Sequence, residues 1–514
     1  MNTKDKKEMK LAQSLGIEVN PYTITDDGEL LSSDGNLLLV DENGTLALPD
    51  RVISIGEGAF ANTGGLKKII IPGSVKEVKA NAFAYNTDLE EVVMEDGVEK
   101  IGERAFVSCN KLQKVTFPDT ITSIGATCFT SCTSLDNVKL PKNLTVLNSQ
   151  TFQACSSLKN VELSEKLETI GSEALQGTKI VTIKFPANLK SIYGSSIETS
   201  TLKEIDTSEN NYYQFKDGIL YSKDYKNLIL AIASVTSINM DSRTETISIS
   251  AFSQCSKITT INLTENVKSI NANAFTNSKL KSITVDGNNK YFKTDEKNNL
   301  YSIDGKLLYK LFDTGNVTIK DGVEGIVRGA LTNSGAIKGI TLPESFTGYS
   351  TNTWGIFPTL DYLYLPKNVK HFTAASYFRV KKIEVSNENP NFKLVDNEYI
   401  LSKDGSALYW VAKEKTEIEV PSTVKEIKDW AFYYSKAQKL TLPKNIEKIG
   451  AYILNSSSVK ELEIQSKIKT INSHAFSSAR SLTKITIDKN ENEVTGSPWG
   501  NPYGDRAVFW KDSE

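Results

Sequence analysis

The residues with the most reactive side chains recur at regular intervals. Cys109, Cys132 and Cys155 lie 23 residues apart, and Cys255 takes the same place three residues after its own Ala-Phe pair. Cys128 and Cys132 have the four-residue separation of a metal-binding pair, but Cys128 replaces the alanine of an Ala-Phe pair. Because the thiols occupy places in a repeated string, we expect small buried side chains and neither a metal site nor a disulfide.

Other catalytic chemistry finds little support. The 514 residues include two histidines, His371 and His474, each near a repeated motif, so we expect surface or packing roles for them. No Gly-rich phosphate loop, Gly-x-Ser-x-Gly string or paired Cys and His occurs. Asp-Gly pairs lie in repeated turns without the spaced carboxylates of a calcium loop. We predict no enzyme activity, no cofactor and no metal. The alternative is an enzyme that uses two Asp or Glu side chains from distant parts of the sequence.

The charge balance and hydropathy exclude two classes of partner. Sixty Lys and Arg stand against 62 Asp and Glu, giving a net charge of -2 and no general attraction to nucleic acid. No apolar run approaches the roughly 20 residues of a membrane span. Residues 1–14 lack the apolar region of a signal peptide. We therefore expect neither nucleic-acid binding nor membrane insertion.

These side chains are held by a repeat of 23 residues. Phenylalanine recurs at this interval, and Leu175 takes the next place; the series is Phe60, Phe83, Phe106, Phe129 and Phe152. A repeat this short forms one coil, which cannot bury its apolar face until neighbouring coils stack on it. We predict a solenoid that is mostly β with short loop or helical turns, with the phenylalanines in an inward row.

Each repeat also carries an apolar-x-apolar-Pro string, as in residues 115–118. Proline cannot donate a ladder hydrogen bond and marks the end of a strand, so we expect short parallel strands lining one face. A glycine precedes the Ala-Phe pair at 56, 102, 125 and 171, and we interpret it as a tight bend.

The regular frame is interrupted by a second repeat. Residues 210–224, 288–305 and 389–405 share an Asn-rich start and a Leu-(Tyr)-Ser-x-Asp string, with Asp-Gly pairs that favour hairpin turns. After residue 488 the aromatic-rich chain predicts a cap with Trp499 over the last coil; a ligand-binding Trp499 is the alternative.

These boundaries predict nine segments. They are an N-terminal segment with a capping hairpin (1–50), leucine-rich repeats (51–205), a β-hairpin insert (206–245), repeats (246–286), an insert (287–320), degenerate repeats (321–386), an insert (387–420), repeats (421–487) and a C-terminal cap (488–514).

Side chains that point outward from the strands are the first candidates for ligand binding, because they have no packing duty. In the first six coils these are Ile70, Val93, Thr116, Lys139, Glu162 and Lys184. Adjacent exposed Ile70 and Val93 suggest a covered surface or a partner. Residues 1–50 folded over them are the simpler explanation, and an ordinary solvated sheet surface is the alternative for the whole set.

A second candidate lies between residues 350 and 380, where aromatic residues are dense and the repeat degenerates. Trp354, Tyr362 and Tyr364 represent it. Such side chains can make a protein or glycan contact, or they fill a coil whose period has slipped.

The string Ile-Gly-x-x-Ala-Phe-x-x-Cys-x-x-Leu-x-x-Val-x-Leu-Pro resembles the BspA-type leucine-rich repeat of bacterial and some protist surface proteins, over residues 25–510. The hairpin inserts resemble spacer modules of the same family. The resemblance implies a right-handed leucine-rich repeat superhelix with a parallel sheet face and β-hairpin inserts. It also implies a secreted or surface-displayed adhesion protein that binds protein or glycan ligands on host or neighbouring cells.

Two expectations accompany this resemblance. We expect a monomer that is extracellular or on the cell surface, with any leader removed from this chain. A structural spacer or display component of a surface or phage-like particle is the alternative function.

Overall fold

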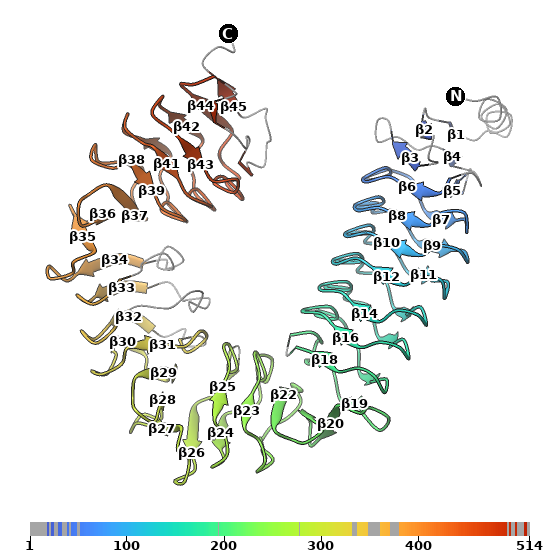
Figure 1. The fold of residues 1–514 in the computed structure, drawn as a ribbon, viewed down its shortest axis with the longest axis horizontal. Helices are drawn as coiled ribbons and strands as arrows, with labels where there is room; N and C mark the ends of the chain where they lie inside the picture. The colour runs from blue at the N-terminus through green and yellow to red at the C-terminus, as the bar shows by residue number, and fades with distance from the viewer. Residues whose placement is uncertain are drawn as a thin grey trace. The chain divides into compact units, whose positions relative to one another are not determined.

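One sequence repeat makes one turn of a β-solenoid. In the repeat that includes Phe83, Glu77–Val78 (β8) form a two-residue strand, residues 80–85 make turns, and Glu91–Met94 (β9) form a longer strand. Figure 1 shows that coils from β6 to β18 follow one another in sequence order, each beside the coil before it. The predicted repeat solenoid with parallel sheets is confirmed, and the described residues contain no α-helix.

The computed structural model describes residues 52–490 except 194, 277, 332–336, 348–359 and 371–379, together with residues 18–19, 22–24, 29–32, 39–40, 43–48, 493–494, 499–500 and 508–510. The chain divides into two units. Unit 1 holds Met1–Lys281 and Asp286–Asn289, and unit 2 holds Ser282–Val285 and Lys290–Glu514. The nine predicted segments are finer than this division and stay a prediction.

The longer strands of unit 1 form its front sheets and pair in parallel from coil to coil, for example with Ile69 opposite Val92. Alternate side chains of each strand enter the core. These front strands are β5 (Thr45–Ala47), β7 (Lys68–Ile71), β9, β11 (Lys114–Thr116), β13 (Asn137–Lys139), β15 (Asn160–Glu162), β17 (Thr182–Lys184), β19 (Glu204–Asp206) and β24 (Thr260–Leu263).

Two-residue strands line a second side of the coils, each with its second residue buried. These side strands of unit 1 are β6 (Ser54–Ile55), β8, β10 (Lys100–Ile101), β12 (Ser123–Ile124), β14 (Val146–Leu147), β16 (Thr169–Ile170), β18 (Ser191–Ile192), β23 (Thr246–Ile247) and β25 (Ser269–Ile270).

The Ala-Phe segment joins coils without forming a strand. Asn81 and Tyr85, two residues before and after Phe83, have positive φ angles of 56° and 64°. Such values are unfavourable for residues with a side chain. Here residues with positive φ are separated by residues with negative φ. This backbone turns N–H groups toward the next coil, so that the Phe83 N–H donates to Ala105 O at 2.8 Å. Sequence analysis expected a loop here but not this repeated left-handed conformation.

The phenylalanine row is stacked as predicted. Consecutive rings from Phe60 to Phe152 lie nearly parallel, with centroids 5.1, 5.2, 5.3 and 5.4 Å apart, and all are fully buried. All five cysteines are free and buried, four of them in the coils of this row, and the Cys109 thiol donates to Phe83 O at 3.3 Å. Burial raises the pKa of Cys109 to about 12, so its thiol stays protonated.

The predicted role of the repeat glycines is corrected at three positions. Gly102, Gly125 and Gly171 do not have positive φ angles. A Cβ at Gly125 would lie 2.4 Å from Glu103 N, and the other two are equally crowded by the preceding coil. These glycines are therefore required by the close approach of neighbouring coils and not by a bend.

Each insert is a three-stranded antiparallel unit, one strand more than the predicted hairpin. Its third strand then pairs in parallel with the next side strand, as Leu228 with Ile247, which returns the chain to the solenoid. The strands are β20 (Tyr213–Lys216), β21 (Ile219–Ser222) and β22 (Asn227–Ala231) in unit 1, and β27 (Phe292–Thr294), β28 (Leu300–Ser302), β29 (Leu307–Lys310), β35 (Phe392–Val395), β36 (Tyr399–Ser402) and β37 (Ala407–Val411) in unit 2.

Unit 2 repeats the coil with longer front strands in its first half. Leu331 stands at the phenylalanine position there and is buried. Its front strands are β26 (Ser282–Val285), β30 (Gly315–Thr318), β32 (Ile337–Thr341), β33 (Leu360–Leu365), β34 (Val380–Val385), β38 (Glu417–Glu419), β40 (Lys439–Thr441), β42 (Glu461–Ile464), β44 (Lys484–Ile487) and β45 (Val508–Trp510); its side strands are β31 (Gly325–Ile326), β39 (Glu426–Ile427), β41 (Lys448–Ile449) and β43 (Thr470–Ile471).

The two ends of the chain are built differently from the interior coils. Trp499 is fully buried against Phe476, at 6.2 Å between ring centroids, so it is the predicted cap residue and not an exposed ligand-binding aromatic. At the other end the strands β1 (Glu18–Val19), β2 (Tyr22–Ile24), β3 (Glu29–Ser32) and β4 (Leu39–Val40) extend the sheets at their edges.

Candidate binding surfaces

The outward residues predicted in unit 1 form one row across neighbouring strands. Ile70 lies opposite Val93, and Val93 opposite Thr116. Farther along, Lys139 lies opposite Glu162. We call Ile70, Val93, Thr116, Lys139, Glu162 and Lys184 the front row; Val93 is half-buried and the others are exposed.

At the apolar end of the front row, the described part of the N-terminal segment lies beside the sheet. β5 pairs beside β7, with Ala47 opposite Ile70 in the backbone register, and so continues the sheet. Ile70 remains 38% exposed. An exposed isoleucine beside a half-buried valine is therefore a surface that a partner can cover.

The charged part of the front sheets is paired between coils. Lys139 Nζ lies 2.6 Å from Glu162 Oε1. Glu91 lies between Lys68 and Lys114, at 2.7 and 3.1 Å, and hydrogen bonds from both ammonium groups hold its pKa below the usual value. Exposed pairs of this kind contribute little to stability, and they leave few unpaired charges for a charged ligand.

In unit 2 the predicted Tyr362 and Tyr364 both point outward from β33 and are half-buried. The Tyr362 hydroxyl donates to Glu384 Oε2 at 3.0 Å, and the Tyr364 hydroxyl donates to Glu344 Oε1 at 3.0 Å. Burial, with a further contribution from Glu384, raises the pKa of Tyr362 to about 12. Trp354 lies outside the described residues.

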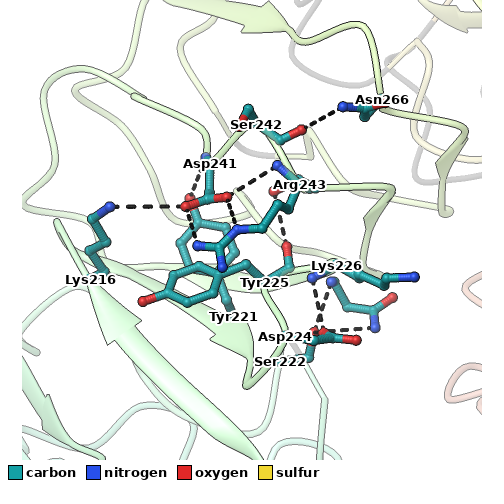
Figure 2. Close-up of polar contacts among 12 residues, drawn as sticks. Lys216, Tyr221, Ser222, Asp224, Tyr225, Lys226, Asp241, Ser242, Arg243 and Asn266 are labelled. Atoms are coloured by element: carbon teal, nitrogen blue, oxygen red, sulfur yellow. Dashed lines mark hydrogen bonds and ion pairs between the residues drawn. The ribbon is translucent and has the colours of Figure 1, made fainter.

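A polar cluster on the first insert was not predicted (Figure 2). Arg243 donates to both carboxylate oxygens of Asp241, at 2.8 and 2.9 Å, and its guanidinium carbon lies 4.0 Å from the centre of the Tyr225 ring. The hydrogen bonds from Arg243 lower the pKa of Asp241 to about 2. The cluster fixes the turn of the insert against the chain that follows it.

Tyr225 has an unusual backbone conformation for a bulky residue. Its φ is 64°, and the equivalent positions of the other inserts are Gly305 and Gly405, with φ of 80° and 81°. Residues in this region store strain that the surroundings must offset, and the Arg243 contact is the visible compensation. Comparison of the three turn strings was the signal that would have found it.

The third insert borders a groove of about 1120 Å³ in unit 2. Its floor includes buried Ile418 and Leu442, and Tyr399 donates its hydroxyl to Glu419 O at 2.8 Å. Its walls carry both acids and lysines. This groove depends on how the insert lies beside the sheet, so sequence reasoning had no signal for it.

A half-exposed aromatic ladder follows three coils of unit 2. Trp430 and Tyr452 stack at 4.6 Å between ring centroids, and Tyr452 lies 5.8 Å from His474. These residues occupy one repeat position, two before the phenylalanine or leucine of each coil. Scanning that position for aromatics would have found the ladder.

An unusual buried amine follows the last strand of the third insert. Lys413 is 6% exposed, its ammonium nitrogen has no hydrogen-bond partner, and the nearby Trp410 Nε1 has none either. Lys413 Nζ lies 5.7 Å from the centre of the Trp410 ring. Burial alone lowers the pKa of Lys413 to about 7.

Among the residues that the structure describes, no three His, Cys, Asp or Glu side chains gather in a metal-binding group. The described part of the chain likewise contains no helix with the length and hydropathy of a membrane span.

Comparison with known families finds one match that spans most of the chain. The model of the BspA type leucine rich repeat region matches in six copies, at residues 42–150, 76–203, 122–233, 222–296, 295–400 and 406–499. No curated protein sequence matches.

Three solved structures with similar folds come from bacterial proteins. A leucine rich cell surface protein from Faecalibacterium prausnitzii A2-165 is 19% identical, with a TM-score of 0.43 and coverage of 94% of this chain and 98% of that chain. A leucine-rich repeat protein from Bacteroides ovatus ATCC 8483 is 16% identical, with a TM-score of 0.37 and coverage of 96% and 98%. The pneumococcal vaccine antigen PcpA is 15% identical, with a TM-score of 0.34 and the same coverage.

Proposed function

This chain belongs to the BspA-type leucine-rich repeat family, and from that premise we propose that it is a non-enzymatic recognition scaffold that uses its outward sheet surface for adhesion. Its partner is a protein, or alternatively a glycan, on host or neighbouring cells. The proposal places the protein outside the cell or on the cell surface and treats it as a monomer.

The observation that carries the proposal is the contrast between constant core and variable surface in unit 1. The core repeats phenylalanine from coil to coil, whereas the front row changes from aliphatic to hydroxyl to charged side chains. Packing requires the repeated core phenylalanines but places no demand on the front row, whose side chains are free for recognition.

Within the front row, the aliphatic end is the contact we favour. Ile70 is the most exposed aliphatic side chain of β7, and its neighbour Val93 continues the apolar surface. Burying such side chains in an interface is favourable by roughly 25 cal/mol per Å² before the costs of association. The flanking lysine and glutamate pairs suit a polar rim around that contact.

Binding of the labelled full-length chain to an array of matrix proteins and host and bacterial glycans tests this function. We expect saturable binding that falls at least about tenfold in the double variant Ile70→Glu and Val93→Glu, because two carboxylates would be buried without partners. A charge-matched control, Thr441→Glu with Thr486→Glu, should bind within about twofold of the wild type.

Equal loss in both double variants would contradict a contact at the front row. Absence of any ligand on the array would instead favour the structural spacer or display component, which needs no ligand.

A further inference from the structure

A second outward surface, in unit 2, has a different composition from the front row. Asn316, Gly339, Tyr362 and Lys382 lie opposite one another on the consecutive strands β30, β32, β33 and β34. Tyr364 and Glu384 lie opposite one another in the next row. We call Asn316, Gly339, Tyr362, Tyr364, Lys382 and Glu384 the tyrosine face.

We propose that the tyrosine face binds a neutral polysaccharide chain, with pyranose rings packed on Tyr362 and Tyr364. This inference rests on the proposed recognition function and names the ligand class for one surface of it. It concerns a surface separate from the front row in sequence and in composition.

The aromatic rings are the first reason. The aliphatic residues of β33, Leu360, Leu363 and Leu365, are buried in the core, so the apolar surface that this strand offers outward is aromatic. A pyranose ring has C–H groups on its faces and hydroxyls around its edge, which match an aromatic ring with polar groups beside it. An aliphatic protein partner would find no matching aliphatic side chain on β33.

The fixed orientation of both rings is the second reason. Each tyrosine hydroxyl donates to a carboxylate, Tyr362 to Glu384 and Tyr364 to Glu344, at 3.0 Å. Side chains held before binding lose less conformational freedom when a ligand arrives. Because donation uses only the hydroxyl proton, the oxygen of Tyr362 can still accept a hydrogen bond from a sugar hydroxyl.

Gly339 is the third reason. A Cβ at this position would lie 2.7 Å from Asn316 Oδ1 and 3.2 Å from Tyr362 Cβ. The missing side chain therefore lets the Asn316 amide and the Tyr362 ring approach each other above the backbone of β32. An amide beside an aromatic ring supplies both donor and acceptor next to a stacking surface.

The charges favour a neutral ligand. Lys382 Nζ lies 2.6 Å from Glu384 Oε1 and 5.8 Å from the centre of the Tyr362 ring. Glu344 accepts hydrogen bonds from the Tyr364 hydroxyl and from the Lys367 N–H. The charged groups named here, one ammonium and two carboxylates, are internally hydrogen-bonded and offer no net attraction to an anionic polymer.

Titration of the full-length chain with soluble hexasaccharides tests the proposal. The probes are cellohexaose, maltohexaose and chitohexaose, with heparin as the anionic comparison, and binding is measured by calorimetry. We expect at least one neutral hexasaccharide to bind with little dependence on salt. Tyr362→Ala should weaken that binding by at least about tenfold, and Tyr362→Phe by less, since it keeps the ring.

Two further variants separate the face from general damage to the fold. Gly339→Ala should weaken binding, because the new Cβ separates Asn316 from Tyr362. The front-row double variant Ile70→Glu and Val93→Glu should leave hexasaccharide binding unchanged. Circular dichroism and thermal melts confirm that each variant is folded; if Tyr362→Ala does not fold, Tyr362→Phe and Gly339→Ala carry the test.

The outcomes distinguish this inference from the proposed function. Neutral binding that survives in Tyr362→Ala, or binding to heparin alone, overturns the tyrosine face. No hexasaccharide binding with saturable binding on the protein array overturns the face and leaves the scaffold function standing. No binding in either experiment overturns both.

Discussion

Two regions of the molecule differ in their buried polar groups: the coils between residues 51 and 205, and the coils after the third insert. In the first region, the position three residues after each phenylalanine is Thr, Asn or Cys, and its polar group bonds to a backbone carbonyl, as Asn86 does to Phe60 O at 2.7 Å. In the second region, the equivalent Ser457 hydroxyl has no partner, and the insert before it buries unpartnered Trp410 and Lys413.

This difference shows what an interruption does to a repeat. In the first region the polar group at this one position finds a backbone carbonyl in every coil of the phenylalanine row, as Cys132 does with Phe106 O, although the Ser74 hydroxyl elsewhere in the same region is buried without a partner. Within the third insert the Trp410 and Lys413 donors are left unpaired, at a cost of about 1–3 kcal/mol each. The row of stacked rings contributes to the stability of the uniform region, and replacing the unpaired groups of the third insert should stabilise the interrupted region.

The largest expected effect is a loss of stability in the uniform region, the coils between residues 51 and 205. Phe106 stacks on both neighbours, at 5.2 and 5.3 Å between ring centroids, so Phe106→Ala should lower the unfolding free energy by about 3–5 kcal/mol. Phe106→Leu, which copies the Leu331 of unit 2, should lose less than half of that. Urea unfolding followed by circular dichroism measures both; hydrogen exchange should place the loosening in the adjoining coils.

Equal losses for Phe106→Ala and Phe106→Leu would mean that ring stacking, and not filled volume, stabilises the row.

The next expected effect is a gain of stability, in the third insert of the interrupted region. Burial lowers the pKa of Lys413 to about 7, whereas the unfolded chain has a value of about 10.4. Between these pH values the unfolded chain binds more protons, so stability rises with pH. Lys413→Met should therefore stabilise the chain by on the order of 4 kcal/mol at pH 7 and below, and by progressively less toward pH 10.

Thermal melts of Lys413→Met and wild type from pH 6 to pH 10 check this prediction. Lys415→Met is the control, since Lys415 is already paired with Glu398 and should show no such gain. A stabilisation that is independent of pH would contradict a titrating amine and indicate improved packing alone.

A smaller loss is expected where coils touch through a glycine. The Cβ of Gly125→Ala would lie 2.4 Å from Glu103 N, so neighbouring coils must separate, at a cost of about 1–3 kcal/mol. Gly64→Ala is the matched control, because nothing lies within 4 Å of its Cβ position. If the two variants melt at the same temperature, the close-approach explanation is wrong.

The smallest effect compares the first and third inserts. Tyr225→Gly removes the cation–π contact with Arg243, worth about 0.5–1 kcal/mol, and the ring contact with Tyr221 at 5.3 Å between centroids. It also relieves backbone strain of about 1–3 kcal/mol, so its melting temperature should change little. The reciprocal Gly405→Tyr lacks an equivalent arginine contact and would meet Lys393 and Thr423, at 3.1 and 3.2 Å from its Cβ. It should be the less stable of the two in parallel melts; the reverse order would contradict the compensation by Arg243.

Much of the coil could be predicted because the same residue types recur at the same repeat positions in many copies. The inward phenylalanines, the outward front row and the buried cysteines each follow from their position in the period. The glycine at 125 was located correctly but explained wrongly, because contact between coils is not visible within one coil. The third strand of each insert was missed because its partner, as Ile247 for Leu228, lies in the following coil.

The candidate surfaces divide in the same way. Ile70 was found from strand alternation, which places every second side chain outward, and Tyr362 from the density of aromatic residues in a degenerate repeat. The Arg243–Asp241–Tyr225 cluster and the groove beside the third insert were not found, because each joins residues whose spacing follows no repeat.

The sequence by itself determined the solenoid, its period, the stacked core and which strand residues face out, because a hydrophobic period of one coil has a single way to bury its apolar face. Only the tertiary structure decided which outward residues meet across strands, how Gly339 brings Asn316 to Tyr362, and that Lys413 is left without a partner. Those outcomes depend on register and on contacts between neighbouring coils, and no single coil encodes them.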